Sequence, residues 1–121
     1  GFLVGASVLL ENGKMANGSN QENVAFPSGL CAERVAIFYA GAKFPDVKIK
    51  SIAVSVFSKS FEVNEIISPC GACRQVMAEY EDKQQNSIKV LLHSPNDQVL
   101  IVNKVQDLLP FMFKNPHLKK Y

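Results

Sequence analysis

The sequence predicts a single domain of the α/β class, built on a mixed β-sheet of about five strands covered by helices. Two observations predict this class. Segments with strand-like and helix-like patterns alternate along the chain, which usually produces a sheet with helices packed on it. The chain has 121 residues, of which 47% are hydrophobic, enough for one buried core without disulfide bonds. No internal repeat, low-complexity segment or linker divides residues 1–121, so we expect one domain.

The first predicted elements are two antiparallel strands joined by a tight turn. Residues 2–10 are rich in apolar and β-branched side chains, and the pair Asn12-Gly13, a strong hairpin signal, follows them. The second strand is expected near residues 14–18. Residues 19–30 mix Ser, Asn, Gly and Pro without periodicity, which indicates a polar loop that is able to line a site.

Helices are predicted at three places. Apolar residues recur at helical spacing over residues 31–42. Pro69 suits the first turn of a helix, because its missing N–H would have no partner there, and so it predicts a second helix over residues 70–81. A third, short helix is expected over residues 104–109.

Three further strands complete the predicted sheet. Residues 51–57 alternate small and branched side chains and are expected to form a mostly buried strand. Residues 88–93 and 98–102 are predicted to form two strands around a turn at residues 94–97.

The composition argues against two classes of partner. Thirteen basic and eleven acidic residues give a net charge of +2, and they are scattered, so no basic surface for a nucleic acid is indicated. The longest apolar runs, such as residues 52–57, are too short to cross a bilayer. No charged-then-apolar leader opens the chain, and the expected location is therefore cytoplasmic.

The three cysteines predict a metal site. Cys70 and Cys73 form a Cys-x-x-Cys pair, a spacing more typical of metal or redox sites than of a disulfide framework. Cys31 and the pair each lie at the start of a predicted helix, where the helix dipole favours the thiolate that a metal needs. Residues three apart share one helix face, so Cys70 and Cys73 are able to bind one ion together.

The number of ligands indicates the kind of zinc site. Structural zinc usually has four protein ligands, whereas catalytic zinc has three and leaves one position for water or substrate. The chain has only three cysteines. His93 ends a predicted strand and His117 lies near the end of the chain, and neither has ligand-like spacing to the cysteines. We therefore expect a catalytic zinc ion with an open position.

Glu33 supplies a candidate proton acceptor. It follows Cys31 by two positions in the first turn of the same predicted helix, where its carboxylate would be able to accept a proton from water on the metal. Taken alone, an acidic residue there would simply complement the helix dipole. Next to three cysteines, the catalytic interpretation is favoured.

Two arginines lie beside these residues. Three thiolates on Zn²⁺ leave a net negative charge, which weakens the ability of the metal to acidify water. Arg34 and Arg74 would offset that charge by donating hydrogen bonds to thiolate sulfur. The alternative for each arginine is an ordinary place on a solvated helix face.

The segments Cys31-Ala-Glu-Arg34 and Pro69-Cys-Gly-Ala-Cys-Arg-Gln75 resemble the paired signature of the cytidine deaminase family, in its small form with three cysteine ligands. The resemblance covers nearly the whole chain, because further segments match in order and approximate spacing: Phe2-x-Val-Gly-Ala6, Gly18-Ser-Asn-Gln-Glu-Asn23 and Leu108-Leu-Pro-x-x-Phe113.

This resemblance implies a fold, an activity and an assembly. The fold would be the family's three-layer α/β architecture. The reaction would be hydrolytic deamination of cytidine and 2′-deoxycytidine to uridine and 2′-deoxyuridine plus ammonia, in pyrimidine salvage. One Zn²⁺ per chain would activate water, and Glu33 would carry a proton first to the ring nitrogen and then to the departing ammonia. The assembly would be a homotetramer.

The resemblance also implies which residues contact the substrate. Asn20 and Glu22 match positions that hold the ribose hydroxyls, and Ala32 belongs to the same substrate site. Phe2 and, from a neighbouring subunit, Phe113 match aromatic positions around the substrate. The charge of Glu22 would repel a phosphate and so favour a free nucleoside over a nucleotide. Without the resemblance, Asn20 and Glu22 would be interpreted as loop-forming residues, and Phe2 and Phe113 as core residues.

The chain departs from the family pattern at several places. The helix that usually precedes the Phe2 segment is expected to be absent from this chain. Leu3 stands where proline is common, Gln21 where a β-branched residue is common, and Phe26 where tyrosine is common. The stretch 58–67 is longer than usual, which is expected to change a subunit contact.

Two other functions remain open from the sequence. A deaminase that acts on cytosine in RNA or DNA would need a basic, aromatic-lined groove, which the sequence does not indicate; a modified nucleoside such as an antibiotic is a related substrate. A zinc-stabilised binding module without catalysis would need a fourth protein ligand, or Glu33 turned away from the metal.

Overall fold

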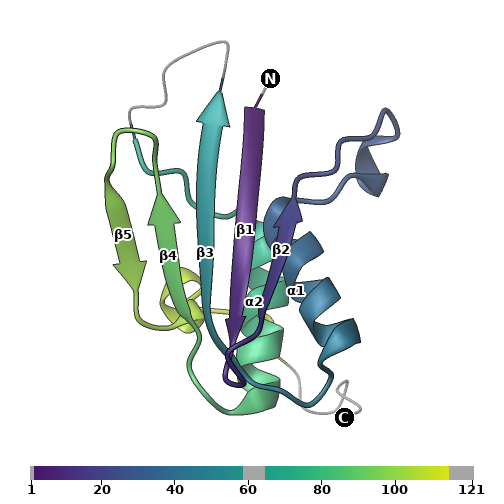
Figure 1. The fold of residues 1–121 in the computed structure, drawn as a ribbon, viewed down its shortest axis with the longest axis vertical. Helices are drawn as coiled ribbons and strands as arrows, with labels where there is room; N and C mark the ends of the chain where they lie inside the picture. The colour runs from purple at the N-terminus through teal and green to yellow at the C-terminus, as the bar shows by residue number, and fades with distance from the viewer. Residues whose placement is uncertain (1, 59–64, 115–121) are drawn as a thin grey trace.

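The computed structural model describes residues 2–58 and 65–114, and Figure 1 shows the fold. In these ranges five strands form one sheet with the order β2-β1-β3-β4-β5. Strands β3 and β4 run parallel, and the other neighbouring pairs are antiparallel. The predicted mixed sheet of about five strands is confirmed. The strand bounds are β1 (Phe2–Leu10), β2 (Met15–Ser19), β3 (Ile49–Ser58), β4 (Lys89–His93) and β5 (Val99–Val102).

Two α-helices, α1 (Ala32–Lys43) and α2 (Gly71–Gln84), lie on the same face of the sheet (Figure 1). Cys31 and Cys70 are the residues immediately before them. The sequence predicts Pro69 in the first turn of this helix. In the structure Pro69 lies before α2, two residues ahead of Gly71. The predicted third helix is a short 3-10 helix, η2 (Val105–Leu108), and another 3-10 helix, η1 (Phe26–Ser28), interrupts the loop before α1.

The β1–β2 hairpin follows from its turn residues. Gly13 has φ = 84°, a conformation that glycine adopts without the steric cost of a side chain. The side-chain oxygen of Asn12 accepts a hydrogen bond from the backbone N–H of Lys14 at 2.9 Å, which stabilises the turn locally. The register that results pairs Gly5 with Ser19.

The core lies between the sheet and the helices. Strand β3 alternates strictly at its centre: Val54 and Val56 are buried, whereas Ala53, Ser55 and Phe57 are exposed. We had expected this strand to be mostly buried, but only the face that contacts the helices is covered in the described ranges. The largest fully buried apolar side chains come from both layers: Leu10, Ile37, Ile52, Met77, Ile88 and Leu92.

Close approach of β2 and α1 places the start of that helix. A Cβ atom built on Gly18 would lie 2.7 Å from the backbone nitrogen of Ala36 and 2.9 Å from the carbonyl oxygen of Ala32. Only glycine allows the strand and the helix to pack this tightly, because the atoms in the way belong to the helix backbone. Gly18 therefore helps to hold Ala32, and with it the first turn of α1, against the sheet.

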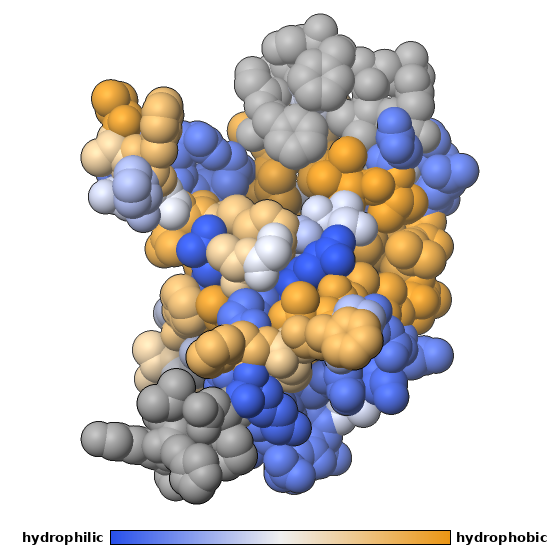
Figure 2. Space-filling view, turned by 180° about the vertical axis from the view of Figure 1, so that it is seen from behind, coloured by the Kyte–Doolittle hydropathy of each residue, from blue (hydrophilic) through white to orange (hydrophobic). Residues whose placement is uncertain are grey.

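The loop between β2 and α1 extends beyond the body of the molecule (Figure 1) and carries hydrophobic surface, as the view from the helix side shows (Figure 2). Val24 is 96% exposed and Phe26 is 87% exposed. In the described part of the chain, no helix has the length and apolar character needed to span a membrane.

Candidate metal centre

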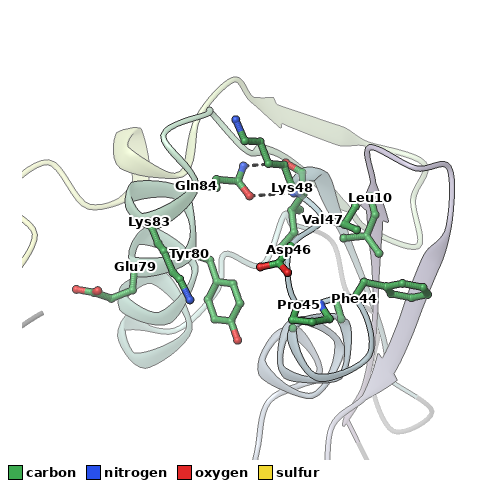
Figure 3. Close-up of a pocket in the computed structure, with 13 residues that line it drawn as sticks. Leu10, Phe44, Pro45, Asp46, Val47, Lys48, Glu79, Tyr80, Lys83 and Gln84 are labelled. Atoms are coloured by element: carbon green, nitrogen blue, oxygen red, sulfur yellow. Dashed lines mark hydrogen bonds between the residues drawn. The ribbon is translucent and has the colours of Figure 1, made fainter. Parts of the chain in front are cut away.

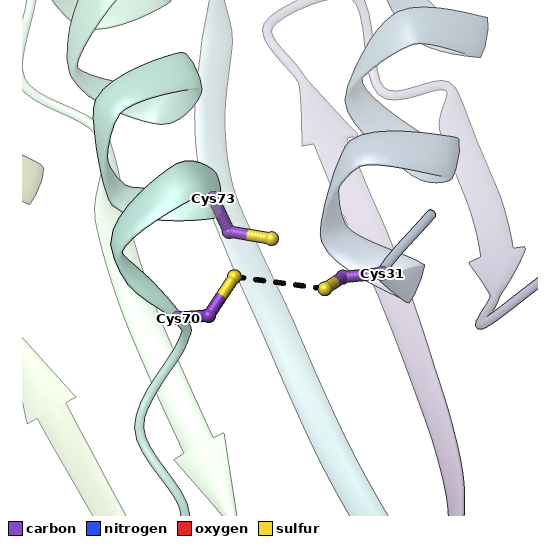
Figure 4. A group of neighbouring side chains, drawn as sticks. All are labelled: Cys31, Cys70 and Cys73. Carbon is purple, nitrogen blue, oxygen red and sulfur yellow. Dashed lines mark hydrogen bonds between the residues drawn. The ribbon is translucent and has the colours of Figure 1, made fainter. Parts of the chain in front are cut away.

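The three cysteines meet between the first turns of the two helices. Cys31 precedes α1, Cys70 precedes α2, and Cys73 lies in the first turn of α2. Their side chains point toward one another (Figure 4). The Sγ atoms of Cys31 and Cys70 are 3.6 Å apart, and all three sulfurs lie within 4.8 Å of one another. The folded chain thus brings together the three residues that the sequence predicts to bind one metal.

This spacing fits zinc. Zn–S bonds of about 2.3 Å at tetrahedral angles place sulfur atoms about 3.8 Å apart. Thiolate sulfur is a preferred ligand of zinc, and neither Cys31 nor Cys70 uses its side chain to cap its own helix. His93 and the acidic residues of the described ranges do not join the group, so the site has three protein ligands there.

The three thiols differ in burial, and the pKa values of Cys70 and Cys73 are shifted in opposite directions. Burial acts to raise the pKa of the Cys70 thiol, but the nearby backbone N–H groups of Cys73 and Ala72 and the neighbouring cysteine side chains outweigh it, so the pKa is lowered. Burial, followed by the negative charge of Glu33, raises the pKa of the Cys73 thiol. Cys73 is the buried end of the cluster and Cys70 is its exposed end.

Glu33 is a buried carboxylate beside this cluster. Only 4% of the residue is exposed, and its charge acts on Cys73. No hydrogen bond to its carboxylate is found within the described residues. A buried carboxylate without hydrogen-bond donors is costly unless a metal, a water molecule or a ligand compensates it. Glu33 lies in the first turn of α1, two residues after Cys31, as the sequence predicts.

Arg34 contacts the sulfurs. Its Nη2 donates to the Sγ of Cys31 at 3.5 Å. Hydrogen bonds with Cys31 and Cys73 raise the pKa of the Arg34 guanidinium still further, so this side chain is a permanent cation. Its Nε atom is buried and has no hydrogen-bond partner in the described part of the chain. The arginine is therefore placed to offset the negative charge of the thiolates.

Arg74 has different partners from those we expected. Its Nε donates to the carbonyl oxygen of Pro69 at 2.9 Å, and its Nη1 donates to the carbonyl oxygen of Leu108 at 2.9 Å. Within the described residues the guanidinium donates to two backbone carbonyls and makes no hydrogen bond to a cysteine sulfur, because Arg74 follows Cys73 on α2 and so lies on a neighbouring face of the helix.

Asn20 and Glu22 lie together just after β2. The side-chain oxygen of Asn20 accepts from the N–H of Val4 at 3.0 Å, and its Nδ2 donates to Oε1 of Glu22 at 2.9 Å. Asn20 therefore also fastens the start of β1, a structural contact that the sequence alone did not suggest. Glu22 is exposed, which leaves its carboxylate accessible to a ligand.

The remaining predicted substrate residues lie on two elements and on the segment that follows η2. Ala32 is fully buried at the start of α1. Phe2 opens β1, where it pairs with Ser58. Phe113 is 69% exposed, and its carbonyl oxygen accepts a hydrogen bond from Nε2 of Gln75 at 3.1 Å. Of residues 58–67, which we expected to alter a subunit contact, 59–64 lie outside the described residues, as does His117.

A cavity of about 550 Å³ lies away from the cysteines, between the last turns of α1 and α2 and the segment that leads into β3 (Figure 3). Tyr80, Lys83 and Asp46 are among its lining residues. The cysteines lie at the opposite ends of both helices, so this cavity is separate from the candidate metal centre.

Comparison with known families identifies the metal centre. Residues 1–87 match the family model described as the cytidine and deoxycytidylate deaminase zinc-binding region. This match spans Cys31, Cys70 and Cys73, and together with their geometry it confirms the prediction of one zinc ion per chain.

Individual relatives agree with this match. The chain is 33% identical to a probable cytidine deaminase of Dictyostelium discoideum, over 97% of this chain and 72% of the relative. It is 38% identical to a cytidine deaminase of Halalkalibacterium halodurans, over 64% of this chain and 54% of the relative. The chain thus spans about half the length of several curated bacterial relatives.

A solved structure supports the same fold. The crystal structure of cytidine deaminase from Burkholderia pseudomallei superposes with a TM-score of 0.78 at 36% identity, covering 93% of this chain and 82% of that one. This likeness is consistent with the three-layer α/β architecture expected from the sequence.

Proposed function

Because the chain belongs to the cytidine and deoxycytidylate deaminase family, we propose that it is a zinc-dependent enzyme that hydrolyses cytidine and 2′-deoxycytidine to uridine and 2′-deoxyuridine with release of ammonia. One observation carries this proposal. Three cysteine sulfurs form an incomplete tetrahedral set, and the buried carboxylate of Glu33 lies beside them. A site with three protein ligands is the pattern of catalytic zinc, whereas a binding module would need four.

The chemistry of the residues present assigns the roles of metal ligand and proton carrier. Cys31, Cys70 and Cys73 would hold the zinc ion, and the chemistry supplied by the bound ion would be the acidification of a water molecule at neutral pH. Glu33 would accept one proton from the attacking water and deliver it to the ring nitrogen next to the amino-bearing carbon. It would then pass the second proton of that water from the new hydroxyl group to the amino group, which leaves as ammonia. One buried carboxylate serves as base and then as acid, because Glu33 is the acidic side chain whose charge acts on the cysteine cluster.

Arg34 adjusts the charge of the site in this proposal. Three thiolates around one divalent cation leave an excess negative charge, which disfavours the loss of a proton from water. The guanidinium of Arg34 donates to the Cys31 sulfur and so withdraws part of that charge. Arg34 thereby makes it easier for the water to lose the proton that Glu33 accepts.

Asn20 and Glu22 bind the sugar in this proposal. An amide donates and accepts hydrogen bonds and a carboxylate accepts them, so the pair is suited to two hydroxyl groups. The hydrogen bond between Asn20 and Glu22 orients both side chains before a ligand arrives. The exposed negative charge of Glu22 favours a free nucleoside over a nucleotide, since a phosphate nearby would be repelled. Ala32, Phe2 and, from a neighbouring subunit, Phe113 complete the proposed substrate contacts.

We further propose a homotetramer that acts in pyrimidine salvage in the cytoplasm. Large apolar side chains that are exposed on one copy support an assembly, because such surfaces usually mark interfaces between proteins. The side chains that support this are Val24, Phe26, Phe111 and Phe113. Light scattering of the purified protein on a size-exclusion column measures the number of subunits, and a stable monomer would contradict the assembly.

A substrate panel tests the proposed activity. Purified zinc-loaded protein is incubated separately with cytidine, 2′-deoxycytidine, dCMP and a cytosine-containing oligonucleotide, and ammonia release is followed together with the change in ultraviolet absorbance. We expect turnover of the two nucleosides and little turnover of the other two compounds.

The Glu22→Gln variant tests whether the charge of Glu22 excludes nucleotides. Removing the charge should raise the ratio of kcat/KM for dCMP to that for 2′-deoxycytidine by about tenfold, which corresponds to a single charge interaction of about 1.4 kcal/mol. The Glu11→Gln variant, in the β1–β2 turn, is the control. Activity on dCMP or the oligonucleotide without activity on the nucleosides would overturn the proposed substrate class.

A further inference from the structure

Cys70 reaches the metal centre from a segment with little regular structure. Residues 65–69 form neither helix nor strand, and Cys70 itself is exposed. Cys31 is held differently, because Leu30 just before it exchanges two backbone hydrogen bonds with Gln21, at 2.8 and 2.9 Å. Cys73 is held by the helix in which it lies. Cys70 is thus the ligand whose position depends most on side-chain contacts.

Arg74 provides the hydrogen bonds to the backbone around Cys70. Its backbone N–H donates to the carbonyl oxygen of Cys70 at 2.9 Å, and its Nε donates to the carbonyl oxygen of Pro69 at 2.9 Å. Within residues 65–70, these are the two backbone carbonyls that accept hydrogen bonds from the described residues. Both donors belong to one residue: the guanidinium holds the carbonyl of the Pro69–Cys70 peptide, and the backbone N–H holds the carbonyl of Cys70, on the other side of the Cys70 Cα atom.

The same guanidinium also contacts the C-terminal part of the described chain. Nη1 of Arg74 donates to the carbonyl oxygen of Leu108, the last residue of η2. The start of η2 is fastened to α2 by Glu81, whose carboxylate accepts from the backbone N–H groups of Val105 at 2.8 Å and Gln106 at 3.0 Å. Leu108 is therefore a well-anchored acceptor, and Arg74 links it to the peptide that precedes Cys70.

We infer that Arg74 is a positioning residue for zinc: it holds the Pro69–Cys70 peptide against η2 so that the Cys70 sulfur stays within bonding distance of the metal. A guanidinium suits this role because it is planar, permanently charged and able to donate in two directions at once. A lysine at this position would have one compact ammonium group and would not reach both carbonyls with the same geometry. The inference concerns zinc retention, and it does not depend on which substrate the enzyme uses.

Zinc release from the Arg74→Met variant tests this inference. Met keeps much of the side-chain length and removes every side-chain donor, while the backbone N–H that donates to the carbonyl oxygen of Cys70 remains. The rate of zinc release to the chromogenic chelator 4-(2-pyridylazo)resorcinol is measured for the intact zinc-loaded protein. We expect release about 10- to 100-fold faster than in the wild type, the range typical for loss of a group that supports a metal ligand. The Co²⁺-substituted variant should also show a weaker thiolate-to-cobalt absorption band, which a general loss of stability would not produce.

Gln75→Ala is the matched control. Gln75 is the next residue on α2 and also binds the C-terminal segment, through the carbonyl oxygen of Phe113, but it makes no hydrogen bond to the Pro69–Cys70 peptide. Its zinc-release rate should equal that of the wild type. If Arg74→Met fails to fold, Arg74→Lys replaces it, with an expected increase of about tenfold. Wild-type release rates in the folded Arg74 variant, or an equal increase in Gln75→Ala, would overturn the inference. Failure of the wild-type protein to act on cytidine, with zinc still bound, would contradict only the proposed function.

Discussion

The Sγ atoms of Cys31 and Cys70 lie 3.6 Å apart, although 39 positions separate the two residues in the sequence. The contact exists because α1 and α2 lie side by side on one face of the sheet and begin at the same end. Two helix N-termini then face one point, and their partial positive charge favours the anionic ligands of a metal. The metal centre therefore depends on the placement of the two helices relative to each other.

Removal of zinc should lower the thermal stability of the protein. A tight ligand at a thousand times its Kd stabilises the folded state by about 4 kcal/mol, and for a domain of this size we expect the Tm to fall by about 10 °C or more after chelation. Differential scanning calorimetry before and after treatment with a chelator measures the change, and added Zn²⁺ should restore the Tm. An unchanged Tm in a sample shown to be metal-free would contradict a zinc ion held between the two helices.

The Glu33→Gln variant should retain zinc and lose turnover. The substitution preserves shape but removes the group that accepts and returns the proton, so kcat should fall by at least about a hundredfold. Zinc content measured by plasma mass spectrometry should stay at the wild-type value. The Glu11→Gln variant, at the far end of the hairpin, should keep wild-type kcat. Near-normal turnover in Glu33→Gln would exclude the proton-transfer role.

The Arg34→Gln variant should make the bound water less acidic. Loss of the cation leaves the thiolate charge uncompensated, so kcat should fall about tenfold and the acidic limb of the pH profile of kcat should move to higher pH. The Arg34→Lys variant keeps a positive charge and should recover part of both effects. A reduced kcat with an unmoved pH profile would indicate a purely structural role for this side chain.

The Gly18→Ala variant should destabilise the fold by about 1–3 kcal/mol, because the new methyl group would overlap the backbone of α1. Gly5→Ala on the adjacent strand is the matched control, since a Cβ atom there meets nothing within 4 Å. Urea denaturation of both zinc-loaded variants gives the free energies of unfolding. Equal stabilities for the two variants would mean that β2 and α1 are able to separate without cost.

Most of the fold was accessible from the sequence because local signals agreed with one another. The Asn12-Gly13 turn, the helical spacing after Cys31 and the strand patterns each predicted an element that the structure contains. The exposure of one face of β3 was not predicted, because alternation of small and branched residues resembles the pattern of a strand covered on both sides.

The metal ligands were predictable and some of their supporting contacts were not. Cysteine spacing and helix starts identify ligands from the sequence, because only a few residue types bind zinc. One partner of Arg74 is Leu108 of η2, 34 positions later in the chain. No local sequence pattern indicates that these two residues meet. The hydrogen bond from Val4 to Asn20 is similar, since it requires the register of the hairpin to be known first.

The parallel pairing of β3 with β4 has a consequence for biosynthesis. Cys70 and Cys73 lie in the crossover between these two strands, so they leave the ribosome well after Cys31 and after all of β3. The sulfur cluster assembles only when that crossover has folded back over the sheet. All three sulfurs are therefore available to one zinc ion only after synthesis has passed Cys73, 42 positions beyond the first ligand, Cys31.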